Sequence, residues 1–218
     1  DWRLLFNKTQ LKKYQNALNL LGVGIVLAHR HTLHDSMFIP LASDQVLTAY
    51  GRHSVWPRAF YTNVVHTYAS IQDFATQVQQ EGAHPFVSVS RETRQQVLTP
   101  SKFRAETGGT PIVVEATHYQ LTNNATRFTI NAPGPGVVYL GEAGDHREFQ
   151  AFVNGKPVPL FTANYAFKAI KLDRAGLYQV VFDYWPSHFT AYVSAAAVGA
   201  SLWLVLLVGA VVVFRRRD

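Results

Sequence analysis

The stretch HRHTLHD at residues 29–35 holds the densest group of side chains that could bind a metal ion. His29, His31 and His34 lie close together there, and imidazole is the commonest metal ligand among protein side chains. A structural zinc site requires four ligands that converge in a tetrahedron, and the sequence has no second cluster with ligand spacing. The stretch is therefore either a metal site or a solvated loop after a strand at residues 25–27, and we favour the loop.

Asp145, His146 and Glu148 could exchange protons with a substrate, because carboxylates and imidazole are the usual general acids and bases. They follow Gly144 in a predicted turn, and a surface turn is the interpretation that we favour. The sequence contains no nucleophile elbow GxSxG, no HExxH, no P-loop and no dinucleotide-binding glycine pattern. We therefore predict no catalytic residue and no cofactor in this chain.

Several other side chains could contact a carbohydrate. Glu142 follows Gly141 at the end of the predicted strand VVYL, where its carboxylate is either structural or a ligand contact. Trp56, Phe149 and Tyr165 could stack on sugar rings, although aromatic residues that alternate along a strand more often belong to the core. The sequence leaves both alternatives open for these residues.

The C-terminal segment has the length and composition of a membrane-spanning helix. Residues 191–214 carry no charged side chain, and about 20 apolar residues are enough to cross a bilayer as a helix. Arg215–Arg217 follow directly, and the positive-inside rule places such a cluster in the cytoplasm. We therefore predict a transmembrane helix at 189–214, a cytoplasmic tail at 215–218, and an extracytoplasmic body at 1–188. Because the body needs an export signal, we also expect a signal sequence or earlier transmembrane helices upstream.

The overall composition narrows the class of protein. The formal net charge is +6, and the basic residues are scattered, so we predict no nucleic-acid partner. The chain has no cysteine, which means that an exported domain must be held together by its core and not by disulfides.

The extracytoplasmic body divides into regions of different periodicity. Residues 1–92 alternate helical patterns, such as SIQDFATQVQQEG, with short strands at 25–27, on both sides of Trp56-Pro57 and at PFVSVS. This alternation predicts a small α/β unit. Residues 93–110 show no clean period and include Gly108-Gly109, which is typical of a linker.

Residues 111–188 change to a period of two. In ATRFTINA, Phe128 and Ile130 point to one face, and Asn154-Gly155 between apolar runs predicts a hairpin. About six strands separated by turns favour an antiparallel β-sandwich of the jelly-roll or immunoglobulin-like type. The fold class that we predict is therefore α+β: a small α/β unit, a β-sandwich and one C-terminal transmembrane helix.

The motifs from residue 136 onward follow a recognisable order. They are GVVYLGEA, then FVNGKPV, NYAFKAI, the turn Ala175-Gly176 and a strand ending YWP, followed by the apolar helix. Together they resemble the C-terminal end of the YfhO family of bacterial membrane proteins. Upstream, ALNLLGVGIVLA and WPRAFYTNVV are similar to the family's LNLLNVKY and LPRAF segments. The chain departs from the family at GDHREF, where Phe149 stands in place of a Trp, and at Gly24-Ile25, where the family has Lys-Tyr.

The resemblance implies a function as well as a fold. YfhO-like proteins are large polytopic membrane proteins similar to C-class glycosyltransferases, which use polyprenyl-phosphate-linked sugars to modify cell-envelope polymers. Their catalytic acidic residues lie between early transmembrane helices, so the resemblance assigns no catalytic residue to this chain. It implies the outer C-terminal part of such a protein in a bacterial cytoplasmic membrane. The implied partners are the lipid bilayer, the upstream transmembrane helices and a cell-envelope glycopolymer.

Within that interpretation, the candidate sugar-contacting residues are Glu142, Phe149, Asn164 and Trp56. Their expected role is to hold or guide the acceptor polymer. The alternative is a free-standing, single-pass protein in which the sandwich is a carbohydrate-binding or sensor module.

Overall fold

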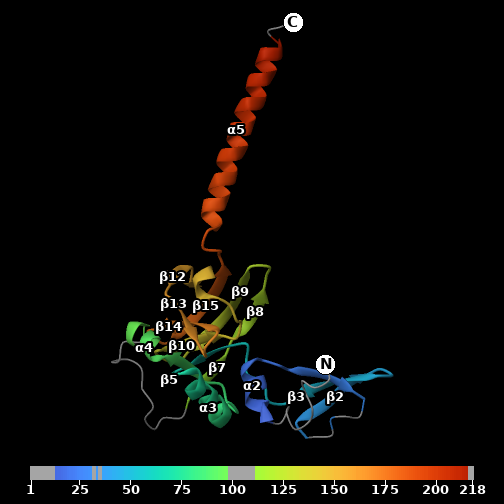
Figure 1. The fold of residues 1–218 in the computed structure, drawn as a ribbon. Coiled ribbons are helices and arrows are strands. Elements are labelled where there is room, and N and C mark those ends of the chain that lie inside the picture. Colours follow the sequence, from blue (N-terminus) through green and yellow to red (C-terminus); the bar gives the residue numbers. More distant parts are fainter. Residues whose placement is uncertain (1–12, 31–32, 34–35, 98–110, 216–218) are drawn as a thin grey trace.

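The computed structural model describes residues 13–30, 33, 36–97 and 111–215. Three packed layers of strands and helices form the body, and one long helix leaves it at the C-terminal end (Figure 1). The fold is therefore mixed α+β with mostly antiparallel sheets, as the sequence predicts.

Two five-stranded antiparallel sheets form the sandwich. The first, here called the middle sheet, has the order β13 (Leu160–Ala163), β14 (Phe167–Leu172), β10 (Gly136–Leu140), β4 (Ala59–Thr62) and β7 (Val113–Glu115). The second, here called the outer sheet, has the order β12 (Lys156–Val158), β11 (Phe149–Val153), β15 (Gly176–Tyr184), β9 (Ala125–Ala132) and β8 (Thr117–Leu121). Apolar side chains from the facing surfaces of both sheets make one core.

The middle sheet is buried on both of its faces. In β10, Val138 and Leu140 pack toward the outer sheet, whereas Val137 and Tyr139 pack into a second core on the opposite side. All five residues of β10 are buried. The sequence of such a strand is a continuous apolar run, because neither face of the strand is exposed to water.

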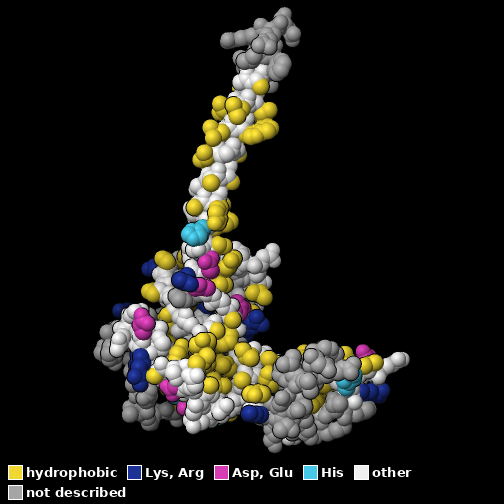
Figure 2. Space-filling view, viewed as in Figure 1, with side chains coloured by type: hydrophobic (Ala, Val, Ile, Leu, Met, Phe, Trp, Pro, Cys, Tyr) yellow, Lys and Arg dark blue, Asp and Glu magenta, His cyan; other side chains and the backbone are white. Residues whose placement is uncertain are grey.

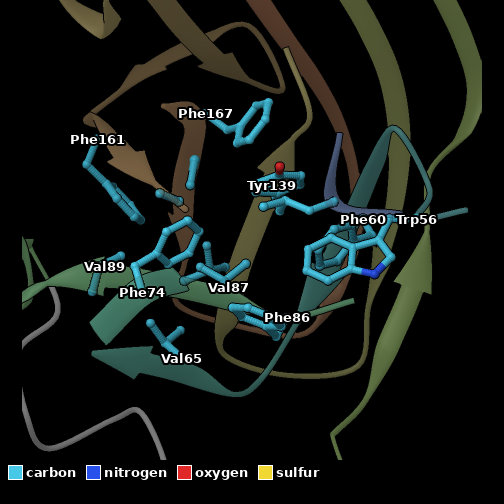
Figure 3. Packing of buried hydrophobic residues seen from close by; sticks show 14 of the residues in the cluster. Trp56, Phe60, Val65, Phe74, Phe86, Val87, Val89, Tyr139, Phe161 and Phe167 are labelled. Atoms are coloured by element: carbon cyan, nitrogen blue, oxygen red, sulfur yellow. The ribbon is translucent and has the colours of Figure 1, made fainter. Parts of the chain in front are cut away.

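The third layer covers the other face of the middle sheet. Strands β5 (Val65–Tyr68) and β6 (Val87–Ser90) pair in parallel and are joined by helix α3 (Ile71–Glu81), as a parallel pair requires a crossover connection. Helix α3 begins after Ser70, whose hydroxyl accepts the Asp73 N–H at 3.1 Å. Phe74 of α3 packs with aromatic side chains of the middle sheet in the core that Figure 3 shows.

A smaller lobe lies beside these layers. It contains helix α2 (Gln15–Leu20) and a three-stranded sheet of β1 (Ile25–His29), β3 (Leu47–Arg52) and β2 (Phe38–Ser43), with β3 in the centre. The Arg52 guanidinium ties this sheet to α2, because it donates to the Asn19 side chain at 2.7 Å and to the Val23 carbonyl at 2.8 Å. Asn19 in turn donates to the Gly82 carbonyl at the end of α3.

Three further helical segments complete the described chain: α4 (Arg91–Val97), the single 3₁₀ turn η2 (His146–Glu148) and α5 (Phe189–Arg215). Helix α5 projects away from the body, and Figure 2 shows hydrophobic side chains along it. Its segment Phe189–Ala210 is long and apolar enough to cross a membrane, and none of it is buried against the rest of the chain. This supports membrane anchoring through α5.

Several local predictions from the sequence are confirmed. Phe128 and Ile130 of β9 are buried, whereas Arg127 and Asn131 of the same strand are exposed. The Asn154-Gly155 turn joins β11 to β12, and both residues have the positive φ angles that a tight hairpin needs.

Other parts of the structure differ from the sequence-based expectation. The segment Ala59–Thr62, assigned to the N-terminal unit, lies inside the sandwich as β4, paired with β10 and β7. The strand at 25–27 forms but is not buried: Ile25 is 60% and Leu27 67% exposed, since only one face of the small sheet is covered. Region 112–185 contains the nine strands β7 to β15 and not about six, because short strands such as β12 carry little period of their own.

The alternation of β15 leads to a stability prediction. Phe182 is 1% exposed in the core between the sheets, whereas Gln179 of the same strand is exposed. We expect Phe182→Ala to lower the free energy of unfolding by about 3–5 kcal/mol, and the matched Gln179→Ala by less than about 0.5 kcal/mol. Urea unfolding of the whole chain in detergent micelles, followed by tryptophan fluorescence, measures both. Equal losses would contradict the register of β15.

Candidate functional site

Glu142 occupies the point where the two sheets of the sandwich are linked by polar contacts. Strand β10 ends at Leu140, and the next residue, Gly141, donates its N–H to the Arg58 carbonyl at 2.7 Å. The Glu142 side chain then reaches the outer sheet, where its carboxylate accepts hydrogen bonds from the Tyr119 hydroxyl and, at 2.9 Å, from the Thr126 hydroxyl. The Arg58 guanidinium lies 3.5 Å from the same carboxylate.

These contacts perturb the titration of Tyr119. Burial disfavours the charged phenolate, and the hydrogen bond to the Glu142 carboxylate disfavours it further, because the phenol is the donor. Together they raise the pKa of Tyr119 to about 12. The neutral phenol is therefore a permanent donor to Glu142 at physiological pH.

Lys168 is the second buried polar group of this region. It is 1% exposed, and it pairs with Leu140 in the register between β14 and β10, which places it next to the turn at Glu142. Its ammonium donates to the Glu142 carbonyl at 2.8 Å and lies 3.8 Å from the centre of the Phe149 ring. Burial lowers the pKa of Lys168, and the Glu142 carboxylate opposes this shift.

A cleft of about 690 Å³ opens beside this cluster. Glu142 and Arg58 line one part of it, and Tyr165, which is 54% exposed, lines another. The remaining lining residues come from α2, from α3, from the end of β8 and from the turns around Gly141 and Asn164. The cleft thus combines an exposed aromatic ring with a carboxylate and a guanidinium, which is a set of groups able to bind a hydroxylated ligand.

A second cleft, of about 550 Å³, runs between α2 and α3. Ile71, Ala75 and Val78 of α3 face it together with Ala17 of α2. The two clefts share four lining residues: Leu20, Leu21, Phe74 and Tyr165. Figure 2 shows hydrophobic side chains gathered where the sandwich meets α2.

The structure places two of the predicted sugar contacts in the interior. Trp56 is 4% exposed, packs edge-on against Phe86 and donates its indole N–H to the Gly82 carbonyl at 3.0 Å, so its ring is not available for stacking on a sugar. Asn164 is 1% exposed, and its amide bridges the Phe86 carbonyl and the Ser88 N–H, which fastens the β13–β14 hairpin to β6.

The other candidates are at the surface or partly covered. Phe149 is partly buried. The Lys168 ammonium lies over its ring, and the Tyr184 ring contacts it edge to face. Glu142 lines the cleft of about 690 Å³, although its carboxylate already accepts hydrogen bonds from Tyr119 and Thr126. The proposed contacts of these side chains with a sugar stay a prediction.

The histidine cluster of the sequence is only partly covered by the structure. His29 ends β1 and is exposed, whereas His31 and His34 lie outside the described residues. Within the described ranges, no group of three His, Cys, Asp or Glu side chains could hold a metal ion. In the turn at η2, Asp145 binds the Arg147 guanidinium at 2.6 Å and Glu148 accepts the Ser187 N–H at 3.0 Å.

Arg58, Tyr119, Thr126 and Lys168 were not singled out by the sequence. They come from four different strands or strand ends, so no local motif connects them. The one available signal was Lys168 in the middle of an apolar run, FKAIKL, where a lysine on the inner face of a strand requires a buried partner.

Comparisons with protein-family models, with curated proteins and with solved structures gave no match to this chain. The class of protein is therefore defined by the structure alone: a three-layered α+β body with a sandwich, attached to one helix that is able to span a membrane.

The Tyr119–Glu142 contact can be tested by titration. We expect the Tyr119 phenol to titrate near 12, and Glu142→Gln to lower that pKa without returning it to the ordinary value of about 10, since burial is the larger cause. The pKa of Tyr119 is higher in the folded state than in the unfolded state. Its contribution to the free energy of unfolding is therefore fully present below about pH 10 and is lost as the pH rises through about 12. Carbon-13 NMR of labelled tyrosine measures the titration. Glu115→Gln, at an exposed carboxylate of β7, is the control, and an equal effect of both variants would contradict the contact.

Proposed function

We propose that this chain is the outer, non-catalytic part of a YfhO-like membrane glycosyltransferase and holds a cell-envelope glycopolymer above the membrane. Residues 1–188 lie outside the cytoplasmic membrane in this proposal, and α5 is the last membrane helix. The resemblance of the motif order to that family motivates the assignment of the parent protein.

One observation carries the binding role: Tyr165, Glu142 and Arg58 converge on a single open cleft of about 690 Å³. Sugars present apolar C–H faces and hydroxyl groups together, and an exposed ring beside charged hydrogen-bonding groups suits both. The floor of the cleft is rigid, because Glu142 is hydrogen-bonded to the outer sheet and Lys168 holds the backbone of the same residue.

The junction with α5 supports a fixed position above the bilayer. After β15, Tyr184 donates its N–H to the Asn124 carbonyl and Trp185 donates to the Glu148 carbonyl at 2.7 Å. Ser187 donates to the Glu148 carboxylate at 3.0 Å, and α5 begins at Phe189. Because the junction between the body and α5 is short and hydrogen-bonded, a polymer bound to the body stays near the membrane surface. The effective concentration of the polymer there is raised.

The proposed orientation predicts a labelling pattern. The chain has no native cysteine, so Thr76→Cys in the exposed part of α3 and Asp218→Cys each introduce one thiol. We expect a membrane-impermeant maleimide to label intact cells carrying the first variant and not the second, because position 76 is outside and position 218 inside. Labelling at position 218 with no labelling at position 76 would show the opposite topology and contradict the proposal.

The binding role predicts a specific effect of Arg58. We expect Arg58→Gln to weaken binding of cell-envelope glycopolymer fragments by about tenfold, since about 1.4 kcal/mol is a modest value for one charge-assisted hydrogen bond. Isothermal titration calorimetry of the whole chain in amphipol, with poly(glycerol phosphate) and with N-acetylglucosamine oligomers, measures the affinity.

Arg147→Gln is the matched control for this experiment, because Arg147 is 77% exposed in its side chain and lies outside the lining of the cleft. Equal affinities of the Arg58 and Arg147 variants, or no binding by the natural chain to either type of polymer, would refute the role of the cleft.

A further inference from the structure

Tyr165 adopts a backbone conformation that a large side chain rarely takes. Its φ angle is 70°, and the N–H of Ala166 donates to the carbonyl of Asn164 at 2.9 Å across it. A hydrogen bond between residues two apart around a residue of positive φ is a γ-turn of the rare, strained kind. Asn164, which precedes it, also has a positive φ of 46°. Glycine would be the natural occupant of position 165 on backbone grounds alone.

The side chain at this strained position is not buried. Tyr165 is 54% exposed, and its ring contacts the Phe74 ring at 6.4 Å between centroids and 18° between planes. Burial in the core therefore does not account for a tyrosine at this position. Residues with a strained backbone are found most often at active sites and ligand sites, and they persist only where the surrounding structure holds them in place.

The ring lies where the two clefts meet. Tyr165 belongs to the lining of both, so a ligand that extends from one cleft into the other passes it. On one side are the charged groups of Glu142 and Arg58. On the other, the α2–α3 cleft presents aliphatic side chains that are open to solvent: Ile71 is 49% and Leu21 57% exposed.

We propose that the two clefts form one extended site for a glycan that carries an apolar acyl or alkyl substituent. The sugar lies against the Arg58–Glu142 pair, the substituent lies on the aliphatic surface between α2 and α3, and the Tyr165 ring separates the two halves. This inference rests on the proposed function and adds the class of ligand. A volume of about 550 Å³ is sufficient for a short chain, and aliphatic side chains favour an alkyl group over an unsubstituted sugar ring.

Methyl and hexyl N-acetyl-β-glucosaminide are the probes, because they differ only in the length of the alkyl group. We expect the whole chain in amphipol to bind the hexyl compound about tenfold more tightly, which corresponds to the removal of about two methylene groups from water. Ile71→Ser should abolish this preference. Ile112→Ser, at an isoleucine that is 44% exposed outside both clefts, should retain it.

The outcomes separate this inference from the proposed function. Equal affinities for the two compounds, with Arg58→Gln still weakening glycopolymer binding, would overturn the apolar half alone. A hexyl preference that survives Ile71→Ser would also overturn it, because adsorption to the amphipol would explain the preference. A retained, Ile71-dependent preference with no effect of Arg58→Gln would support the apolar half and contradict the proposed sugar cleft.

Tyr165→Gly tests the reason for the strain. Glycine adopts the left-handed conformation without a steric penalty, so we expect the midpoint of urea unfolding to be no lower than that of the natural chain. The same variant should bind hexyl N-acetyl-β-glucosaminide at least about tenfold more weakly, because one aromatic platform is lost. A lower midpoint together with unchanged binding would assign Tyr165 a structural role and overturn the inference.

Discussion

Burial of the middle sheet on both faces is the constraint on which the rest of the structure depends. Its strands must present apolar side chains to the outer sheet on one side and to the α3 layer on the other. Strand β4 shows this most clearly, since Phe60 belongs to one core and Tyr61 to the other, and both are 0% exposed. Because β4 comes from the N-terminal half and its neighbours β7 and β10 from the C-terminal half, the two halves share one structural unit.

Two buried cores also determine where polar groups can be accommodated. Glu142 and Lys168 lie near the end of the sandwich from which α5 departs. Glu142 accepts a hydrogen bond from Thr126, and Thr126 pairs with Phe182, which is two residues before the end of β15. Charged groups in such positions are tolerated only when hydrogen bonds replace their hydration. The Tyr119 and Thr126 hydroxyls provide this for Glu142, and a carbonyl and the Phe149 ring provide it for Lys168.

The loop at Tyr165 is held in place by this rigid framework. Asn164, one residue earlier, is buried, and its side-chain amide is hydrogen-bonded to Ser88 in β6 and to Phe86 just before β6, which holds the β13–β14 loop in place. A loop fastened in this way can maintain the positive φ of Tyr165 and keep its ring exposed over the clefts. The stability of the core thus allows a locally unfavourable conformation at the surface.

The sequence by itself determined the features that depend on neighbouring residues. The uncharged run at residues 191–214, the alternation of Phe128 and Ile130, and the Asn154-Gly155 turn each predict an element through local composition, periodicity or φ preference, and the structure contains all three. Only the tertiary structure decided which strands share a sheet, because long-range pairing leaves no local signal. It moved Ala59–Thr62 into the sandwich and buried Trp56. It also brought Arg58, Tyr119, Thr126 and Glu142 together, since residues so distant along the chain meet only when two sheets pack face to face.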